Sequence, residues 1–111
     1  MVYGEEYTIT TKNPTLATVV SAHVTNAFGA TAISGGNVTK DGDDVISARG
    51  VCWSTDHNPT IEDNKTVDGT GTGEFISTLT GLTPEVTYYL RAYATNFAGT
   101  AYGEEISFST I

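Results

Sequence analysis

The chain has 111 residues, of which 39% are apolar and 16% charged, and this length fits one domain that buries a core without disulfides or metals. Its 5 basic residues against 13 acidic ones give a net charge of −8, so we expect neither nucleic acid nor an anionic membrane as a partner. Apolar runs are far shorter than a membrane-spanning helix, so no membrane insertion is expected, and the single cysteine, Cys52, excludes an internal disulfide.

The first predicted element, residues 2–11, resembles the last one, residues 101–110. The two segments read VYGEEYTITT and AYGEEISFST, so four consecutive residues, Tyr-Gly-Glu-Glu, are identical and the others keep their type. The offset of 99 residues is the size of one β-sandwich domain. Because a strand buries alternate residues, equal spacing predicts that both segments occupy the same position of the same fold, with Tyr3, Tyr7 and Ile9 aligned with Tyr102, Ile106 and Phe108.

This repeat predicts a tandem array. We expect residues 1–12 to be the leftover last strand of a preceding repeat and residues 13–111 to be one domain. A chance similarity between two strands is the alternative, and the four-residue identity favours the array. The leftover strand would have an apolar face, so it could fray, cover an edge of its own domain or pair with another molecule. Self-association through residues 2–11 is therefore expected at high concentration.

Strand and turn patterns divide the rest of the chain into short strands. Asn13-Pro14 breaks the chain after the first segment. No window carries a sustained helical period, so an all-β chain is predicted. Short runs rich in Thr, Val and aromatic residues, bounded by turn residues, predict further strands at residues 16–24, 30–39, 45–55, 74–80, 87–96 and 100–110.

The connections between these strands carry their own signals. Asp41-Gly42 predicts a hairpin loop over residues 40–44, and residues 25–29 are predicted to be a turn. Gly35-Gly36 inside a strand indicates a bulge or a close approach of another strand. Residues 56–73 form a long polar connection, with room for a short strand near residues 65–67.

The segment GLTPEVTYYLRA, residues 81–92, resembles the E–F corner of a fibronectin type III domain. In that family a Leu-x-Pro-x-x-x-Tyr pattern enters strand F, and here it falls on Leu82, Pro84 and Tyr88. The resemblance implies that the Tyr88 hydroxyl bonds to upstream backbone. It further implies an immunoglobulin-like, two-sheet antiparallel sandwich of about seven strands. Other segments resemble a bacterial subgroup found in tandem in secreted and cell-surface proteins: RGVCWST at 49–55, NPTI at 58–61, GTGTG at 69–73 and residues 91–103.

Alternation along two strands predicts which side chains face the core. Many family members have a core Trp where this chain has Gly35 and Gly36, so we expect Val51 and Trp53 to face inward to fill the space. Gly50 and Cys52 then face outward. In the strand at residues 87–96, the side chains predicted to lie in the core are Tyr88, Leu90, Ala92 and Ala94.

No residues are placed for catalysis, so no enzyme activity and no cofactor are expected. Cys52 and His57 are five residues apart at the end of a strand, too far for the hydrogen bond of a Cys–His pair. The GTGTG segment lacks the following helix of a phosphate-binding loop, so a flexible loop is favoured. Three carboxylates, Asp41, Asp43 and Asp44, leave weak calcium binding open, but a solvated hairpin is favoured.

The outward positions Tyr89, Arg91 and Tyr93 predict a flat amphipathic patch that could stack on a sugar or contact a surface protein. Cross-strand pairing that stabilises the sheet is the favoured alternative. These patterns favour a non-catalytic extracellular or cell-surface module, a spacer or adhesion unit whose partners are neighbouring repeats of the same chain. The alternatives are a carbohydrate-binding accessory module of a glycan-processing enzyme and a sandwich that recruits a partner through its edge strands.

Overall fold

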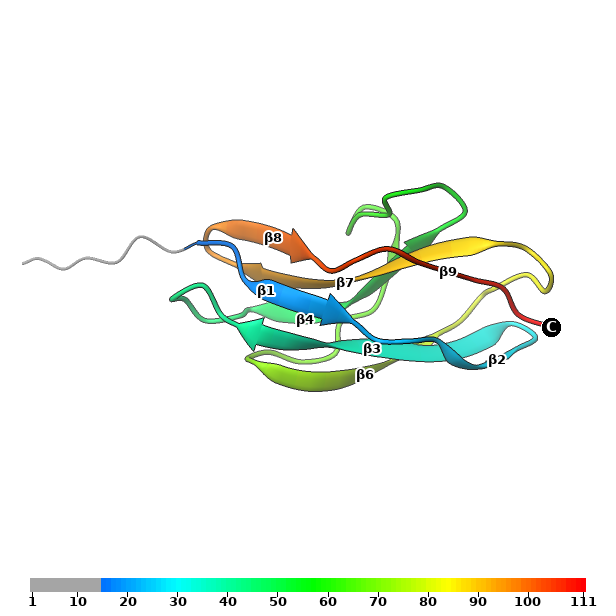
Figure 1. Ribbon diagram of the computed structural model, residues 1–111, viewed down its shortest axis with the longest axis horizontal. Helices are drawn as coiled ribbons and strands as arrows, with labels where there is room; N and C mark the ends of the chain where they lie inside the picture. The colour runs from blue at the N-terminus through cyan, green and yellow to red at the C-terminus, as the bar shows by residue number, and fades with distance from the viewer. Residues whose placement is uncertain (1–14) are drawn as a thin grey trace, which may run out of the picture.

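The computed structural model describes residues 15–111, which form two antiparallel sheets packed face to face (Figure 1). The described residues contain no helix, and thus none that is long and apolar enough to cross a membrane. The strands are β1 (Thr18–Ser21), β2 (Thr25–Phe28), β3 (Thr31–Lys40), β4 (Ala48–Ser54), β5 (Asn64–Lys65), β6 (Gly73–Leu79), β7 (Tyr88–Asn96), β8 (Gly99–Tyr102) and β9 (Ile106–Phe108). The predicted all-β sandwich is therefore confirmed, whereas the leftover strand predicted at residues 1–12 lies outside the described residues.

One sheet is built around β3, which pairs with β1 and β2 on one side and with β6 on the other. The other sheet runs β5–β4–β7, with β8 and β9 end to end along β7. The predicted strand at residues 16–24 is shorter, and residues 25–28, predicted to be a turn, form β2 against β3. The loop at residues 40–44 was predicted to be a hairpin, and this is wrong because it joins β3 to β4 in the opposite sheet. An Asp-Gly turn reverses the chain, but it does not decide which strand becomes the partner.

The inner faces of the two sheets form one apolar core. On β7 the alternating residues predicted to lie in the core are all buried, as are Val51 and Trp53 on β4, so both inward faces are confirmed. Each fully buried large apolar side chain contributes about 1.5–3 kcal/mol. The core residues are Ala17, Val19, Ala32, Val38, Ile46, Val51, Trp53, Phe75, Leu79, Leu82, Tyr88, Leu90, Ala92, Ala94 and Ala101.

Gly36 marks a close approach between the sheets and not a bulge, because β3 and β6 stay in regular register along this stretch. A Cβ atom on Gly36 would lie 2.8 Å from Cβ of Ala92 and 2.9 Å from Cζ of Phe75. The space beside Gly36, where no side chain comes from β3, is thus occupied by the Phe75 ring from the neighbouring strand. The sequence placed Val51 and Trp53 correctly but missed Phe75 as the residue that contacts Gly36.

The last strand is interrupted by a β-bulge, which corrects one prediction. Tyr93 pairs with Tyr102, whereas Leu90 pairs with Ile106, so the outer segment has one residue more than β7 between these pairs. The extra residue reverses the alternation. Tyr102 therefore faces the outer side of the sheet, while Ile106 and Phe108 pack against the core. Equal facing of these three side chains, predicted from their even spacing, is wrong for Tyr102.

Candidate functional site

The polar connection at residues 55–72 covers the outer side of the β4–β7 sheet. It hydrogen-bonds along β4, with Thr66 N donating to Val51 O (2.8 Å) and Asp68 N donating to Arg49 O (2.6 Å). Arg49 and Asp68 are also joined through the Arg49 side chain, whose Nε donates to Asp68 O at 3.1 Å. The connection thus extends the β4 edge of the sheet, and through Pro59 and Thr66 it also covers the outer face as an outer layer, which the sequence pattern of polar residues and glycines did not reveal.

This layer buries a residue that was predicted to lie on an open surface. Tyr93 is only 1% exposed, and its hydroxyl donates to Thr66 O at 2.5 Å. Arg91 is partly buried, and its Nε and a terminal nitrogen both donate to Pro59 O at 2.9 and 2.5 Å. The flat exposed patch predicted from Tyr89, Arg91 and Tyr93 is therefore wrong for Tyr93, because a strand's outward residues are exposed only if nothing covers them.

Tyr89, the remaining member of that patch, is partly exposed and carries the His57 ring against it, with centroids 4.0 Å apart. His57 Nδ1 in turn lies 2.8 Å from Oε2 of Glu105. His57 lies in the connection and not in a strand, so the contact of this patch that matches the favoured alternative, cross-strand pairing, is the one between Arg91 on β7 and Tyr102 on β8. Binding of a glycan or protein at Tyr89 and Arg91 stays a prediction.

The buried groups under this layer are poor nucleophiles. Burial raises the pKa of the Cys52 thiol to about 11, although the nearby Arg91 opposes the shift. Burial, reinforced by the negative charge of Asp68, raises the pKa of Tyr93 to about 12. A thiol with such a pKa stays protonated at neutral pH and is inert. The Cys52 Sγ contacts Pro59 O, whereas the exposed His57 contacts Glu105, so the structure does not bring the two together.

Tyr102, Gly103, Glu104 and Glu105, the residues shared with the N-terminal segment, each make a contact that depends on this fold. The Tyr102 ring stacks under the Arg91 guanidinium at 4.1 Å, and its hydroxyl accepts from Ile61 N. A Cβ atom on Gly103 would lie 2.6 Å from Ser21 Oγ and 2.8 Å from Ser21 N, so only glycine fits beside β1.

The two glutamates of this segment bind different parts of the chain. Oε1 of Glu104 accepts from Ser21 N at 3.0 Å, and its backbone carbonyl accepts from Ser21 Oγ at 2.7 Å. Oε1 of Glu105 accepts from Asn58 N at 2.5 Å and thereby fixes the connection. The Ser21 N–H lowers the pKa of Glu104, and the Asn58 N–H followed by His57 lowers that of Glu105. Glu104 joins the two sheets and Glu105 attaches the outer layer.

The predicted corner at Leu82, Pro84 and Tyr88 has the backbone contact that the resemblance implies. The Tyr88 hydroxyl accepts from Thr83 N at 2.8 Å, and its ring stacks on Phe108 with centroids 5.6 Å apart. Leu82 and Tyr88 are buried, whereas Pro84 is exposed. These residues support the fold and do not form a site.

The acidic loop uses carboxylates to shape itself. Oδ1 of Asp41 accepts from Asp43 N at 3.0 Å, and Oδ2 of Asp44 accepts from Phe97 N at 2.7 Å. Between residues 15 and 111, no three His, Cys, Asp or Glu side chains are grouped so that they could hold a metal ion. Weak calcium binding by this loop stays a hypothesis, and a calcium-dependent, chelator-reversible thermal shift would be its evidence.

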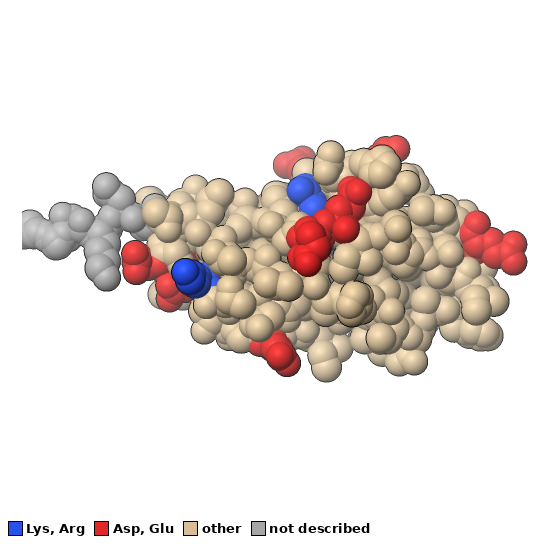
Figure 2. All heavy atoms as spheres, in the orientation of Figure 1, with Lys and Arg blue, Asp and Glu red and all other residues tan. Residues whose placement is uncertain are grey.

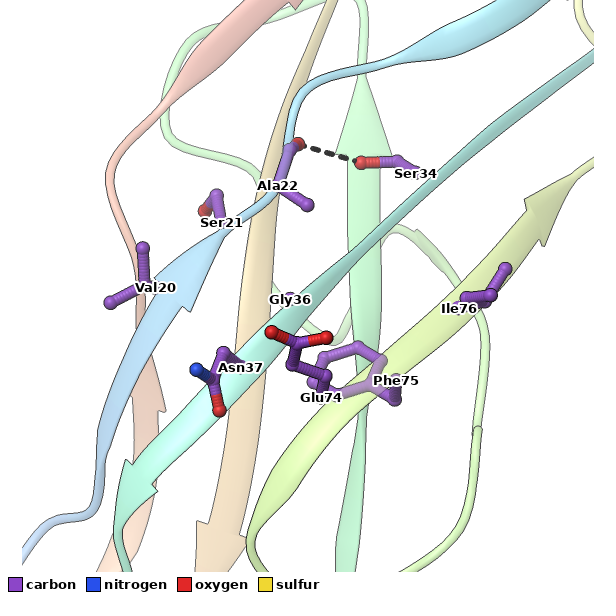
Figure 3. A pocket seen from close by; sticks show the side chains of 9 residues that line it. All are labelled: Val20, Ser21, Ala22, Ser34, Gly36, Asn37, Glu74, Phe75 and Ile76. Atoms are coloured by element: carbon purple, nitrogen blue, oxygen red, sulfur yellow. Dashed lines mark hydrogen bonds between the residues drawn. The ribbon is translucent and has the colours of Figure 1, made fainter.

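A groove of about 670 Å³ lies on the outer face of the other sheet, over β1, β3 and β6 (Figure 3). Val20 and Ile76 are exposed on either side of it, and Asn37 and Glu74 supply polar groups. Its one aromatic, Phe75, is buried in the core, so the groove has no exposed ring for stacking on a sugar.

Comparison with known proteins supports the fold. No protein-family model matches the sequence, and no curated protein matches it either. Among solved structures, the chain is similar to the sensor domain of the anti-sigma factor RsgI4 in Pseudobacteroides cellulosolvens, with 17% identity and a TM-score of 0.61 over 86% of this chain and 94% of that chain. It is also similar to a myokine, with 17% identity and a TM-score of 0.60 over 88% and 98%.

A third similar structure is the sixth fibronectin type III domain of human fibronectin type III domain containing protein 3. The identity is 18% and the TM-score 0.58, over 91% of this chain and 89% of that domain. At these identities the likeness concerns the fold. The described chain is an all-β sandwich of the fibronectin type III-like kind.

Proposed function

We propose that the protein is a non-catalytic module of an extracellular or cell-surface tandem array, in which it spaces or presents other domains and adheres through repeated weak contacts. The supporting observation is the role of the repeated residues Tyr-Gly-Glu-Glu. In residues 102–105 the three side chains contact Arg91, Ser21 and Asn58, and Gly103 leaves no room for a Cβ atom beside Ser21, so each identity meets a requirement of this fold.

A fifth identity extends the argument. Thr110 corresponds to Thr11, and in the structure Thr110 is buried with its hydroxyl donating to Gly29 O at 2.6 Å. A strand that matched by chance would have no reason to repeat a sterically required glycine, two carboxylates with different partners and a buried hydroxyl. Residues 2–11 therefore have the side chains that the last strand of another copy would need.

The buried chemistry agrees with a structural role. Cys52 is enclosed and its thiol is protonated, and the groups around it serve to attach the outer layer. The carbohydrate-binding alternative has less support, because Tyr93 is buried and Tyr89 already stacks on His57. A sugar would have to displace that ring.

The test of the array is the natural coding sequence on the N-terminal side of Val2. The proposal expects a further copy of about 100 residues that ends in the Tyr-Gly-Glu-Glu segment and carries a serine at the position of Ser21. An unrelated sequence there would refute the array.

The role within the array has a separate measurement. The nine residues of β7 at about 3.3 Å each make a copy at least about 30 Å long. A spacer predicts that the maximum dimension in small-angle scattering grows by at least that much with each added copy. A carbohydrate-binding module predicts instead a shift of the Tyr89 signals on glycan titration, with Tyr89→Ala as the matched control.

A further inference from the structure

The end of the molecule at which the described chain starts carries exposed apolar side chains. We define this N-terminal pole by residues 15–16 and the loops at 41–47 and 96–99. Phe97 is 88% exposed and Val45 75% exposed, and the two line a hollow of about 520 Å³. Leu16, also exposed, lies beside Gly99 in the same region. An exposed apolar cluster of this kind is typical of a surface that contacts another protein.

Hydrogen bonds hold this pole in one conformation. The Asn96 side-chain nitrogen donates to Thr15 O at 2.7 Å and to Asp41 O at 2.9 Å, and Thr15 N donates to Gly42 O at 2.9 Å. Phe97 is fixed by its own backbone N–H, which donates to Asp44. Ordering the loop before binding reduces the entropic cost of forming an interface.

The opposite end, where the chain terminates (Figure 1), is the C-terminal pole, and it also has exposed apolar side chains. Phe28 is 72% exposed and Ile111 is 79% exposed. Backbone bonds bring them together, because Gly29 N donates to Ile111 O at 3.0 Å and Glu85 N donates to Thr110 O at 2.9 Å. The last residues of a copy are thus part of its C-terminal pole.

The repeat places these two poles near each other in an array. Thr11 corresponds to Thr110 at the C-terminal pole of a preceding copy, and Thr15 is bonded at the N-terminal pole of this copy. Four residue steps of at most about 3.6 Å separate them, so these two residues, one on each pole, lie within about 14 Å of each other. At that distance side chains of Phe size from both poles reach each other.

We propose that the N-terminal pole of this module docks on the C-terminal pole of the preceding copy, with Phe97, Val45 and Leu16 packed against the counterpart of the exposed Phe28. This inference rests on the proposed array. The surface that binds the N-terminal pole is the preceding copy and no other partner, because the chain connection holds the C-terminal pole of that copy close to it. The docked array is a stiff rod, whereas undocked copies form a flexible string.

Charge at the two ends opposes docking in part. Acidic side chains lie at both ends of the molecule (Figure 2), which by itself would separate successive copies. The residue that corresponds to Ile111 in the preceding copy is Lys12, so the sequence that joins the two copies carries one positive charge. One positive charge in this sequence reduces the net negative charge between the two copies.

The test uses a two-copy chain in which residues 1–110 are followed directly by residues 12–111, so that the natural spacing is kept. Rotational diffusion measured by NMR relaxation should show both copies tumbling as one elongated body. Phe97→Ser in the second copy should release them to tumble independently. Ile76→Ser, at an apolar side chain that is 75% exposed on the sheet face, is the matched control and should change nothing.

The same substitutions in the single-copy chain exclude a folding defect. Phe97 contacts the rest of the domain through its backbone N–H, so Phe97→Ser should leave the unfolding midpoint unchanged there. Independent tumbling of the unsubstituted two-copy chain would overturn the docking while leaving the array intact. If the natural sequence has no preceding copy, the proposed array itself would be refuted. Tumbling that is coupled but insensitive to Phe97→Ser would also overturn the proposed contact.

Discussion

The most informative single substitution is Gly103→Ala, at the β-bulge between β8 and β9. The new methyl group would lie 2.6 Å from Ser21 Oγ, 2.8 Å from Ser21 N and 3.1 Å from Val19 O. Two of these atoms belong to the β1 backbone, which must therefore move. Overpacking of this kind costs about 1–3 kcal/mol. Movement of β1 also lengthens the two Ser21–Glu104 hydrogen bonds, each worth about 1 kcal/mol.

We therefore expect Gly103→Ala to lower the free energy of unfolding by about 2–4 kcal/mol, and the melting temperature by about 10–25 °C for a domain of this size. The free energy of unfolding is measured by denaturant unfolding, followed through Trp53 fluorescence. Gly29→Ala is the control, because no atom lies within 4 Å of its added Cβ and only its positive φ of +64° disfavours alanine, at about 1 kcal/mol. A loss at Gly103 no larger than that at Gly29 would refute the steric argument.

Three further predictions follow from the buried and paired groups. Tyr93→Phe should lower the free energy of unfolding by about 1 kcal/mol, because the hydrogen bond to Thr66 O is lost, and it should remove a phenolate titration near pH 12. Because folding raises the pKa of Tyr93 from 10, the stability of the unsubstituted chain should decline between pH 10 and about 12. Titration of Tyr93 at the usual pH of a tyrosine would contradict this. The lowered pKa of Glu104 stabilises the fold at pH values above 4.5, and this stabilisation is lost as pH falls through the folded pKa. Glu104→Gln should therefore destabilise the chain at neutral pH and progressively less as the pH is lowered, as measured by urea unfolding. Cys52 should react with a thiol reagent only as fast as the chain unfolds, and rapid labelling of the native protein would show that it is accessible.

Much of the sandwich is predictable from local patterns. Alternation in β7 and β4 located the core side chains because both strands have one face on the opposite sheet, so period-two burial reports directly on the fold. The corner at Leu82 and Tyr88 is local in sequence, with only five residues between Thr83 N and the hydroxyl it binds. Contacts between residues this close in sequence can be predicted from a motif of a few residues.

The features that the sequence did not reveal depend on contacts between distant residues. The burial of Tyr93 results from the connection at residues 55–72, which follows a different strand and has no apolar pattern of its own. The bulge near Gly103 adds one residue to a strand that otherwise alternates regularly, and it reverses the facing of Tyr102. Repeat identity at Gly103 was visible in the sequence, but the reason for it, the proximity of Ser21, required the structure.

The central claim is that residues 2–11 can serve as the last strand of this fold. The direct test replaces residues 101–110 in the full chain by VYGEEYTITT, which changes five side chains and keeps Tyr102, Gly103, Glu104, Glu105 and Thr110. The account predicts that this chimera unfolds cooperatively in urea, and that Gly103→Ala destabilises it as it does the original chain. A chimera that is unfolded in the absence of urea, while its Ser107→Thr single-substitution control is folded, would contradict the claim.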